Sequence, residues 1–470
     1  RIEVENAWPN PRFDLWSVLD LAFYRGIDTL HGFRRPRFAT PLYHRVVRRL
    51  AGVGRLAHPS LGGRPGTTHS VEVDVAVVGG GESGRACAER LRTGGRTVHV
   101  IDRGRAGGPR TPTSGHTVAF LPPPTADAAR PFVLLGSRED GAGLLVHASK
   151  VVVATGGYDA NLLFDGNDRP GVVTGDGAEA LAGPDGSPPF RHAVLFGGSE
   201  RTAELLDRFG ERVEAIVAPG PIPPTIAERA SRFDVPLYPR TLLIGTRGRS
   251  RVRGVVLRPR GGGPTFSLTV DAVVLTHRRL PTAQLFFQSG ARMAWRAGVG
   301  AYFPVLGAGV ETSVPGLYAA GEAAGFLGRE GARRSGELAA EQILGRDVSE
   351  LPPRVEAERP GEMLGYFHEV LPDLLRRRRP VLCPCEDVLL RELEEAHQAG
   401  YRGMEVVKRY TGVGTGLCQG RYCLPDVLLL LSILEGRPPA EVGYITQRPP
   451  VFPAPLDALA RIELPAEAAA

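Results

Sequence analysis

Lysine is nearly absent from this chain of 470 residues: Lys150 and Lys408 are the only two, so the formal net charge of +6 comes almost wholly from arginine. The arginines are scattered and form no basic stripe, which argues against a nucleic-acid partner. No apolar run reaches the roughly 18–20 residues that a membrane-spanning helix needs; residues 424–434 come closest and are too few. We therefore expect a soluble cytoplasmic protein without a transmembrane segment.

Cysteine is also rare, and its distribution is uneven. Cys87 stands alone in a predicted helix as a buried packing residue, whereas Cys383-Pro-Cys385 and Cys418-Gln-Gly-Arg-Tyr-Cys423 form a C-x-C and a C-x4-C pair. Two short-spaced pairs on two loops can supply the four thiolates of a 2Fe-2S cluster. Zinc and disulfides are the alternatives, but zinc favours C-x2-4-C pairs, and a disulfide framework suits small secreted domains.

The sequence around these cysteines fits an iron–sulfur site. Glu386 and Asp387 are expected to open a helix that Gly400 ends. Glycines then surround Cys418, where the backbone must approach the cluster and point N–H groups at its sulfurs. These glycines are at positions 412, 414, 416 and 420.

A dinucleotide-binding pattern lies near the start of the predicted core. Its parts follow in order: an apolar strand at 73–78, the loop Gly79-Gly-Gly81-Glu-Ser-Gly84, a helix at 85–91, a strand at 97–101 and Asp102. Gly79 allows a tight turn, Gly81 the close approach of backbone to a pyrophosphate, and Gly84 close helix–strand packing. Asp102 is expected to accept a hydrogen bond from a ribose hydroxyl.

Two further glycine turns point to a flavin rather than to a simple nicotinamide dehydrogenase. The segments Val151–Gly157 and Gly316–Glu322 are buried-type strands that end in glycine. Together they resemble the A-T-G and G-D segments of two-dinucleotide-domain flavoproteins. That resemblance implies an acid beside the ribitol and pyrophosphate, and Glu322 stands here in place of the commoner aspartate.

A third strand–turn–helix unit begins at residues 193–199, followed by a strand at 213–217. It predicts a second Rossmann-like domain inserted into the first. Its glycine pattern is degraded, because Thr202 occupies the place of the third glycine. A nicotinamide site and a purely structural domain are both open at this point.

Nearly the whole chain resembles one family, the alpha subunits of heteromeric sarcosine oxidases, dye-linked proline dehydrogenases, opine oxidases and hydrogen cyanide synthase. The C-terminal part is similar to bacterioferritin-associated-ferredoxin-like 2Fe-2S domains. The residues that carry the resemblance are Glu5-Asn-Ala-Trp-Pro9, Phe13-Asp-Leu15, Ala154-Thr-Gly-Gly-Tyr158, Asp168-Arg-Pro-Gly-Val172, Cys383-Pro-Cys-Glu-Asp-Val388, Arg409-Tyr-Thr411 and Cys418-Gln-Gly-Arg421.

The resemblance implies FAD, with NAD or ATP as the alternative occupant of that site, and a 2Fe-2S cluster. It also implies a beta subunit that carries the substrate-oxidising FAD. A separate small ferredoxin-like 2Fe-2S subunit is a further expected partner, because the ferredoxin-like domain that precedes the connector in sarcosine oxidases is not in this sequence. Residues 104–147 are shorter than in the family, so part of the flavin's wall is expected to be missing.

We predict an α/β two-dinucleotide-binding-domain flavoprotein, Rossmann-like, with a small helical 2Fe-2S domain at the C-terminus. Its segments are a connector arm (1–70), an FAD-binding domain in two parts (71–190 and 271–350), an inserted dinucleotide-binding-like domain (191–270), a linker (351–380), the 2Fe-2S domain (381–440) and an extended tail (441–470). The predicted cofactor-binding residues are Gly79, Gly81, Glu82, Ser83, Gly84, Asp102, Arg103, Gly108, Ala154, Thr155, Gly156, Gly321 and Glu322. The predicted iron ligands are Cys383, Cys385, Cys418 and Cys423.

Three functions fit these features. The first is an electron-transfer oxidoreductase subunit that passes electrons from a partner's flavin to an acceptor; no acid–base residue is assigned, because the substrate chemistry lies on the partner. The second is a self-contained NAD(P)H-dependent flavin and 2Fe-2S oxidoreductase. The third is an assembly subunit with a vestigial nucleotide site.

Overall fold

The computed structural model describes residues 68–103, 115–121, 130–138, 142–183, 185–326, 328–348, 350–354, 362–377 and 380–454, with a few isolated positions nearer the ends. The chain divides into two compact units, Arg1–Pro65 and Gly66–Ala470. In the first unit, β1 (Pro9–Asn10) pairs antiparallel with β2 (Phe13–Asp14). The sheets and helices of the following paragraphs belong to the second unit.

The first sheet is built around a long central strand. Its order is β4-β3-β7-β6-β5, and β20 pairs with β7. The parallel strands are β3 (Thr68–Val78), β4 (Val98–Ile101), β7 (Gly143–Val153) and β20 (Leu317–Ala319), and β6 (Phe132–Arg138) and β5 (Gly115–Leu121) add antiparallel strands. Buried valines run continuously along the ends of β3 and β7, as expected of strands covered on both faces.

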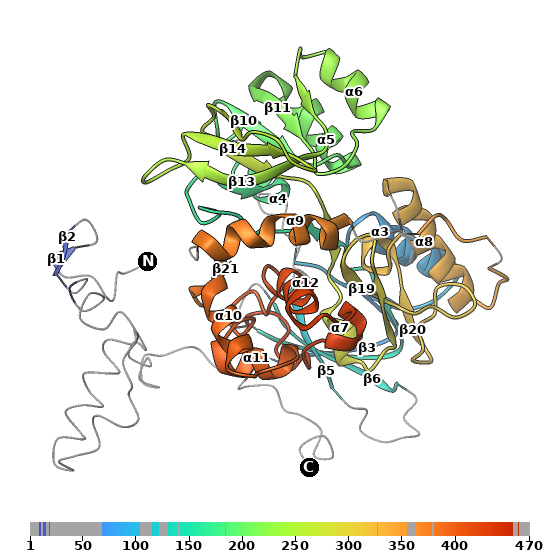
Figure 1. Cartoon of the computed structure of the whole chain (residues 1–470). Helices are drawn as coiled ribbons and strands as arrows, with labels where there is room; N and C mark the ends of the chain where they lie inside the picture. The colour runs from blue at the N-terminus through green and yellow to red at the C-terminus, as the bar shows by residue number, and fades with distance from the viewer. Residues whose placement is uncertain are drawn as a thin grey trace, which may run out of the picture. The chain divides into compact units, whose positions relative to one another are not determined.

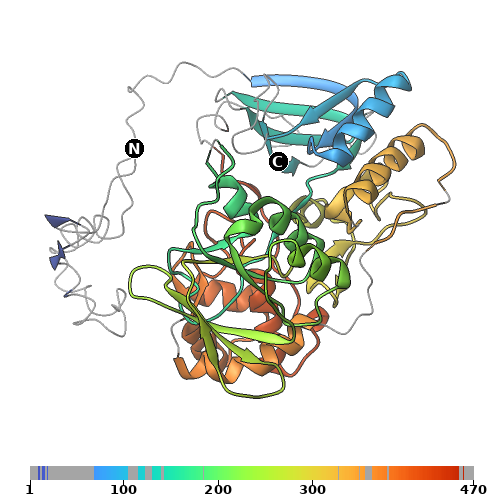
Figure 2. The same ribbon diagram turned by 90° about the horizontal axis from the view of Figure 1, so that it is seen from above.

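Two helices pack together against this sheet. They are α3 (Glu82–Thr93) and α8 (Gly328–Ile343), which lie side by side in Figures 1 and 2. A Cβ at Gly336 would lie 2.0 Å from the carbonyl oxygen of Ser83, so glycine permits the close crossing. Cys87 is fully buried in α3, in the packing role expected of it.

The second sheet is wholly parallel, in the order β12-β11-β10-β16-β9. Its strands are β9 (Val172–Thr174), β10 (Ala193–Phe196), β11 (Val213–Val217), β12 (Leu237–Tyr238) and β16 (Ala272–Leu275). Around it lie α4 (Gly175–Ala180), α5 (Glu200–Phe209), the 3-10 helix η3 (Gly210–Arg212), α6 (Pro224–Ser231) and the antiparallel strands β13 (Thr241–Arg247), β14 (Gly254–Pro259) and β15 (Phe266–Leu268). The sheet thus extends past residues 191–270, to β9 on one side and β16 on the other.

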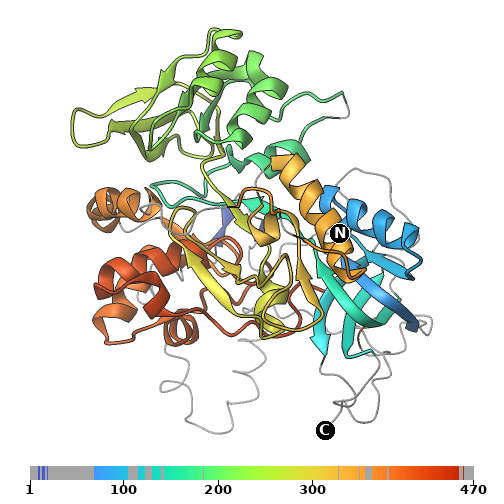
Figure 3. The same ribbon diagram turned by 90° about the vertical axis from the view of Figure 1, so that its right-hand side faces the viewer.

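Short elements connect the two sheets. They are β8 (Gly157–Asp159), β17 (Arg279–Pro281), α7 (Gln284–Gln288), β18 (Met293–Arg296), β19 (Ala301–Pro304) and the 3-10 helix η4 (Gly321–Ala324). Figure 3 shows the yellow strands between the C-terminal helices and the sheet that contains β3.

The C-terminal region is mainly helical. Its elements are α9 (Glu362–Arg377), β21 (Val381–Cys383), β22 (Val388–Leu389), α10 (Leu390–Gln398), α11 (Met404–Thr411), α12 (Leu424–Glu435) and α13 (Pro439–Val442). The helix expected to open at Glu386 begins instead at Leu390, because Asp387 adopts a positive φ of 52° and the chain forms β22 first. None of the described helices is long and apolar enough to cross a membrane.

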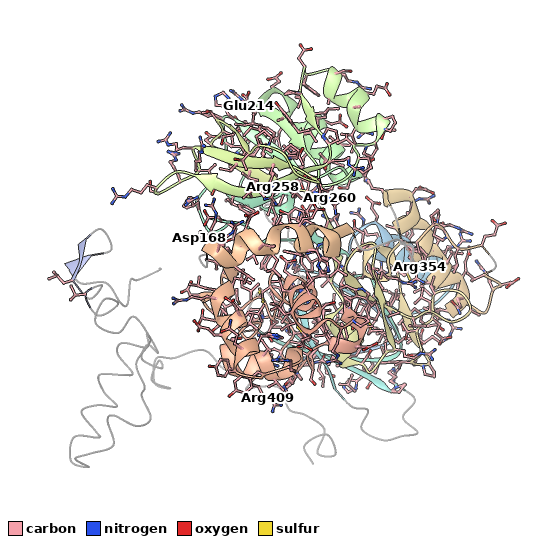
Figure 4. The ribbon with its side chains drawn as sticks, in the orientation of Figure 1. Asp168, Glu214, Arg258, Arg260, Arg354 and Arg409 are labelled. Atoms are coloured by element: carbon pink, nitrogen blue, oxygen red, sulfur yellow. The ribbon has the colours of Figure 1, made fainter. Side chains whose placement is uncertain are left out.

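Helix α9 lies in the segment expected to be a linker. Its buried residues recur at helical spacing: Met363, Tyr366, Phe367, Val370, Leu371 and Leu374. They join one hydrophobic core that contains both α12 and the interior of the second sheet. Figure 4 shows Arg258 and Arg260 at this junction, where Arg258 pairs with Asp373 at 2.5 Å and Arg260 pairs with Glu369.

Candidate nucleotide and iron–sulfur sites

The glycine loop after β3 has the geometry that a bound pyrophosphate requires. Gly79 adopts a φ of 109°, and a Cβ there would lie 2.2 Å from the carbonyl oxygen of Ala154. A Cβ at Gly84 would lie 1.8 Å from the carbonyl oxygen of Gly79, whereas a Cβ at Gly81 would meet nothing within 4 Å. Helix α3 begins after Gly81 with no side-chain cap. Its first N–H groups are thus available to an anion in the open space at Gly81.

The predicted ribose acid lies against this loop. The carboxyl carbon of Asp102, at the end of β4, is 2.9 Å from the place that a Cβ at Gly80 would occupy. Arg103 follows, and its guanidinium carbon is 5.6 Å from the centre of the Phe452 ring. Glu82, in the first turn of α3, pairs with Arg329 at 2.8 Å. Gly108 lies outside the described residues.

The two other glycine turns meet at the same edge of the sheet. Ala154 donates its backbone N–H to the carbonyl of Val78 at 2.8 Å, and Thr155 donates its hydroxyl to the carbonyl of Thr282 at 2.8 Å. A Cβ at Gly321 would lie 3.1 Å from the Ser83 Cβ. The Ser83 hydroxyl is buried and has no hydrogen-bond partner within the described part of the chain. The structure therefore gathers at one edge all of the predicted nucleotide residues that it describes.

Glu322 differs from the expectation, because an arginine that the sequence analysis missed binds its carboxylate. Arg279 donates from Nε and Nη2 to the two Glu322 oxygens, each at 3.0 Å, and the Gly157 N–H donates to the same carboxylate at 3.1 Å. Burial acts to lower the pKa of Arg279, but the carboxylates of Glu322 and Asp159 outweigh it and raise that pKa. The only sequence signal was an arginine pair directly after the strand β16 and the Thr-His that follows it.

Arg279 belongs to a wider charge network. Asp159, whose side chain is fully buried, accepts hydrogen bonds from Arg279 at 3.0 Å and from Arg201 at 3.1 Å. Burial and the neighbouring Asp176 carboxylate raise the pKa of Asp159. Arg201 further pairs with Glu179 at 2.7 Å. The network ties η4, beside the predicted nucleotide site, to α4 and α5 of the second sheet.

The four C-terminal cysteines lie together as two pairs. Cys383, at the end of β21, accepts a hydrogen bond from the Cys423 thiol, and Cys385 interacts with Cys418. The Cys423 bond, with further backbone N–H donors that include Gly414, lowers the pKa of Cys383 to about 6 although burial opposes this. All four are free thiols, so the disulfide alternative is wrong for them.

The loops around the cysteines fit a cluster. A Cβ at Gly416 would lie 2.3 Å from the Cys385 Cβ, and Cβ atoms at Gly414 and Gly420 would collide with Leu424. Backbone N–H donors and a thiolate-favouring environment suit iron–sulfur ligation. Among the described residues, no group of three or more His, Cys, Asp or Glu side chains is arranged around the place of a single metal ion. The cysteines are therefore two pairs rather than a preformed tetrahedral set.

A tyrosine joins the two sites. Tyr158, directly after Gly157, donates its hydroxyl to the carbonyl of Arg421 at 2.9 Å. Its ring meets that of Tyr422 edge to face, with centroids 6.3 Å apart. Because Tyr422 precedes Cys423, the predicted flavin turn at Ala154–Gly157 and the cysteine loop are in direct contact.

The turn after β10 offers no comparable opening. Ser199 donates its hydroxyl to the Thr276 carbonyl at 2.9 Å, and its backbone N–H donates to the Thr202 hydroxyl at 3.3 Å. Thr202 thus closes the start of α5, where the third glycine of a nucleotide site would stand. This geometry favours the structural interpretation of the inserted domain, and a nicotinamide site there stays a prediction.

Comparison with known proteins agrees with this geometry. The family model of the sarcosine oxidase A3 domain matches residues 377–462. The sarcosine oxidase alpha subunit of Rhizobium meliloti is 26% identical over 97% of this chain and 49% of its own length. The chain is a relative of sarcosine and opine oxidase alpha subunits. An opine oxidase subunit of Rhizobium meliloti is 28% identical over 67% of this chain and 77% of its own length.

A solved structure shows the same fold. The L-proline dehydrogenase of P. horikoshii matches with a TM-score of 0.63 at 22% identity, over 83% of this chain and 80% of that one. The family resemblance, the α/β flavoprotein-type fold and the oxidoreductase-subunit class expected from the sequence are confirmed. The chain spans about half the length of the sarcosine oxidase relative.

Proposed function

We propose that this chain is the FAD- and 2Fe-2S-carrying alpha subunit of a heteromeric dehydrogenase or oxidase that acts on a secondary amine or amino acid. In this proposal a beta subunit oxidises the substrate on its own FAD, and this chain passes the electrons to an acceptor. A bound flavin would supply two-electron chemistry, and a 2Fe-2S cluster would supply one-electron exchange.

The direct contact between the two candidate sites carries this proposal. Tyr158 follows the Ala154–Gly157 turn and donates to the loop that holds Cys418 and Cys423. A chain that only held its partners together would not need its glycine loop and its cysteine loop in contact. The relatives' names support the class of substrate, because they are subunits of sarcosine and opine oxidases.

The residues of the chain have definable roles in this scheme. The open N-terminus of α3 would bind the pyrophosphate, and Asp102 would orient the ribose. Cys383, Cys385, Cys418 and Cys423 would hold the two irons, with the Gly414 N–H donating to the Cys383 sulfur. Tyr158 and Tyr422 would fix the distance between the two groups and exclude water between them.

An assembly subunit with a bound but inactive nucleotide is the second candidate. One observation favours it: Arg279 already binds the Glu322 carboxylate, which the resemblance places beside the ribitol. In that case the nucleotide would stay oxidised when the complex turns over.

The test is anaerobic purification, followed by assay of flavin, iron and acid-labile sulfide. We expect about two irons, two sulfides and one flavin per chain. Cys418→Ser should lose the iron and keep the flavin, whereas Cys87→Ser, which changes a cysteine buried in α3, should keep both. Iron without any dinucleotide would contradict the relay, and flavin without iron would contradict the cluster.

A further inference from the structure

Three segments that are far apart in the sequence meet beside the predicted ribose acid. Arg103 directly follows Asp102, Arg421 lies in the cysteine loop, and Phe452 comes from the C-terminal tail. The guanidinium carbons of Arg103 and Arg421 lie 5.6 and 5.2 Å from the centre of the Phe452 ring. Val451, the neighbour of Phe452, is buried in the same core as β3. The tail is therefore anchored at the sheet that carries the glycine loop.

The charges at this point are unbalanced. Within the described residues, neither Arg103 nor Arg421 forms an ion pair with a carboxylate. The Nε of Arg421 is buried, and no described group accepts a hydrogen bond from it. Two guanidinium groups thus approach one ring without a counterion. A partly buried positive charge is costly unless an anion and its hydrogen-bond acceptors compensate it.

Two anions are available in principle. One is the cluster, because Cys418 lies on the same loop and interacts electrostatically with Arg421. The other is a nucleotide at the Gly79–Gly84 loop, because Arg103 is joined to Asp102 and Asp102 lies against Gly80. The position of Arg103 favours the nucleotide, since Arg103 belongs to the nucleotide-binding strand and not to the cysteine loop.

We propose that Arg103 and Arg421, on either side of Phe452, form an arginine clamp that binds a phosphate of the adenine nucleotide held at the Gly79–Gly84 loop. The cysteine loop then completes the nucleotide site. This inference rests on the proposed nucleotide binding and adds to it a contribution from the iron–sulfur domain. Because Tyr158 holds the carbonyl of Arg421, the loop is positioned for this role by the flavin turn itself.

The proposal predicts a dependence of nucleotide affinity on the cysteine loop. In the full-length, cluster-loaded chain, Arg421→Gln and Arg103→Gln should each weaken binding of FAD and of ADP by about tenfold or more, as the loss of a charge-assisted hydrogen bond does. Binding of adenosine, which has no phosphate, should change little. Titration calorimetry with FAD, ADP and adenosine measures all three.

Arg409→Gln is the matched control. Arg409 is 69% exposed on α11 of the same domain, pairs with Glu405 and points away from the helices in Figure 4. This variant should bind FAD and ADP as the unchanged chain does. Visible absorbance of the cluster and a melting curve check that each variant is folded, and Arg103→Gln lies outside the cysteine domain altogether.

The outcomes separate the two levels of the argument. If the unchanged chain binds FAD or ADP and both arginine variants bind equally well, the arginine clamp is wrong and the proposed function stands. If Arg421→Gln shifts only the reduction potential of the cluster, Arg421 serves the cluster and the arginine clamp is again wrong. If the unchanged chain binds neither probe, the nucleotide site fails and the arginine clamp with it.

Discussion

Gly81 and Gly84 stand three residues apart in one loop but have opposite surroundings. A Cβ at Gly84 would meet the Gly79 carbonyl oxygen at 1.8 Å, and a Cβ at Gly81 would meet nothing within 4 Å. The same glycine motif thus contains one position required by packing and one that leaves room for a ligand. The sequence predicted both roles, because they follow from the order strand, turn and helix.

This contrast gives a prediction. Gly84→Ala should lower the free energy of unfolding by about 1–3 kcal/mol, since the backbone at Gly79 must move. Gly81→Ala should change it by no more than about 0.5 kcal/mol but should weaken dinucleotide binding, because the methyl group fills the ligand's space. Urea unfolding and FAD titration of the two variants provide the measurement. Equal losses of stability would contradict the assignment.

At the same scale, Glu322 shows what a local pattern does not contain. Its place after Gly321 was predictable from the G-D resemblance. Its partner Arg279 comes from a strand more than forty residues earlier, and only the pairing of β17 with β8 brings it there. Ion pairs between distant strands leave no local signature, so sequence reasoning missed this one.

At the scale of elements, α12 is fixed to the flavin-type domain by a buried ion pair. Arg278 and Asp426 lie 2.5 Å apart, with side chains 3% and 4% exposed. Burial raises the pKa of Asp426 from 3.8 to about 6, although Arg278 opposes this. Asp426 lies three residues after Cys423, so this pair also holds the helix that follows the cysteine loop.

The Asp426 shift predicts a pH dependence. The folded chain binds the proton more tightly than the unfolded chain, so the stability that protonated Asp426 contributes is present below pH 3.8 and is lost as the pH rises to about 6. Relative to Asp426→Asn, the unfolding free energy should fall by about 2–3 kcal/mol across that window and level off above it. Denaturant unfolding of both chains at pH 4 to 8 measures this difference. A difference that rises with pH would contradict it.

Helix α9 is the element that the sequence analysis missed. Its apolar residues do recur at helical spacing, but proline at 372 and the adjoining arginines favoured a linker. The helix forms because Tyr366 and Phe367 are buried in the core and the Tyr366 hydroxyl donates to the Leu243 carbonyl at 2.9 Å. Packing against a distant strand outweighed the local breakers.

At the scale of the whole molecule, charge and core both cross the expected domain boundaries. The cysteine domain shares one core with the second sheet, and the network of Arg201, Arg279 and Asp159 joins that sheet to the nucleotide edge. The parts therefore behave as one framework around the two candidate sites, rather than as domains joined by a linker.

Loss of one network arginine tests this view. Arg279→Gln should lower the free energy of unfolding by about 2–4 kcal/mol, because it leaves the fully buried Asp159 and the Glu322 carboxylate with fewer partners. Arg333→Gln is the control: Arg333 pairs with Glu330 and Glu337 on the exposed face of α8 and should cost less than about 1 kcal/mol. Thermal unfolding of the two variants distinguishes them. Similar losses would show that the network adds no more than surface pairs do.

The sequence by itself determined the strand–turn–helix unit at Gly79, the acid at Asp102, the four cysteines and the family, because each is a local pattern of residue types at fixed spacing. The tertiary structure alone decided the Arg279–Glu322 pair, the place of α9, the contact of Tyr158 with the cysteine loop and the meeting of Arg103, Arg421 and Phe452. All of these join residues far apart in the chain. Such contacts are set by how the sheets and helices pack, and packing is a property of the whole fold that no local window of sequence contains.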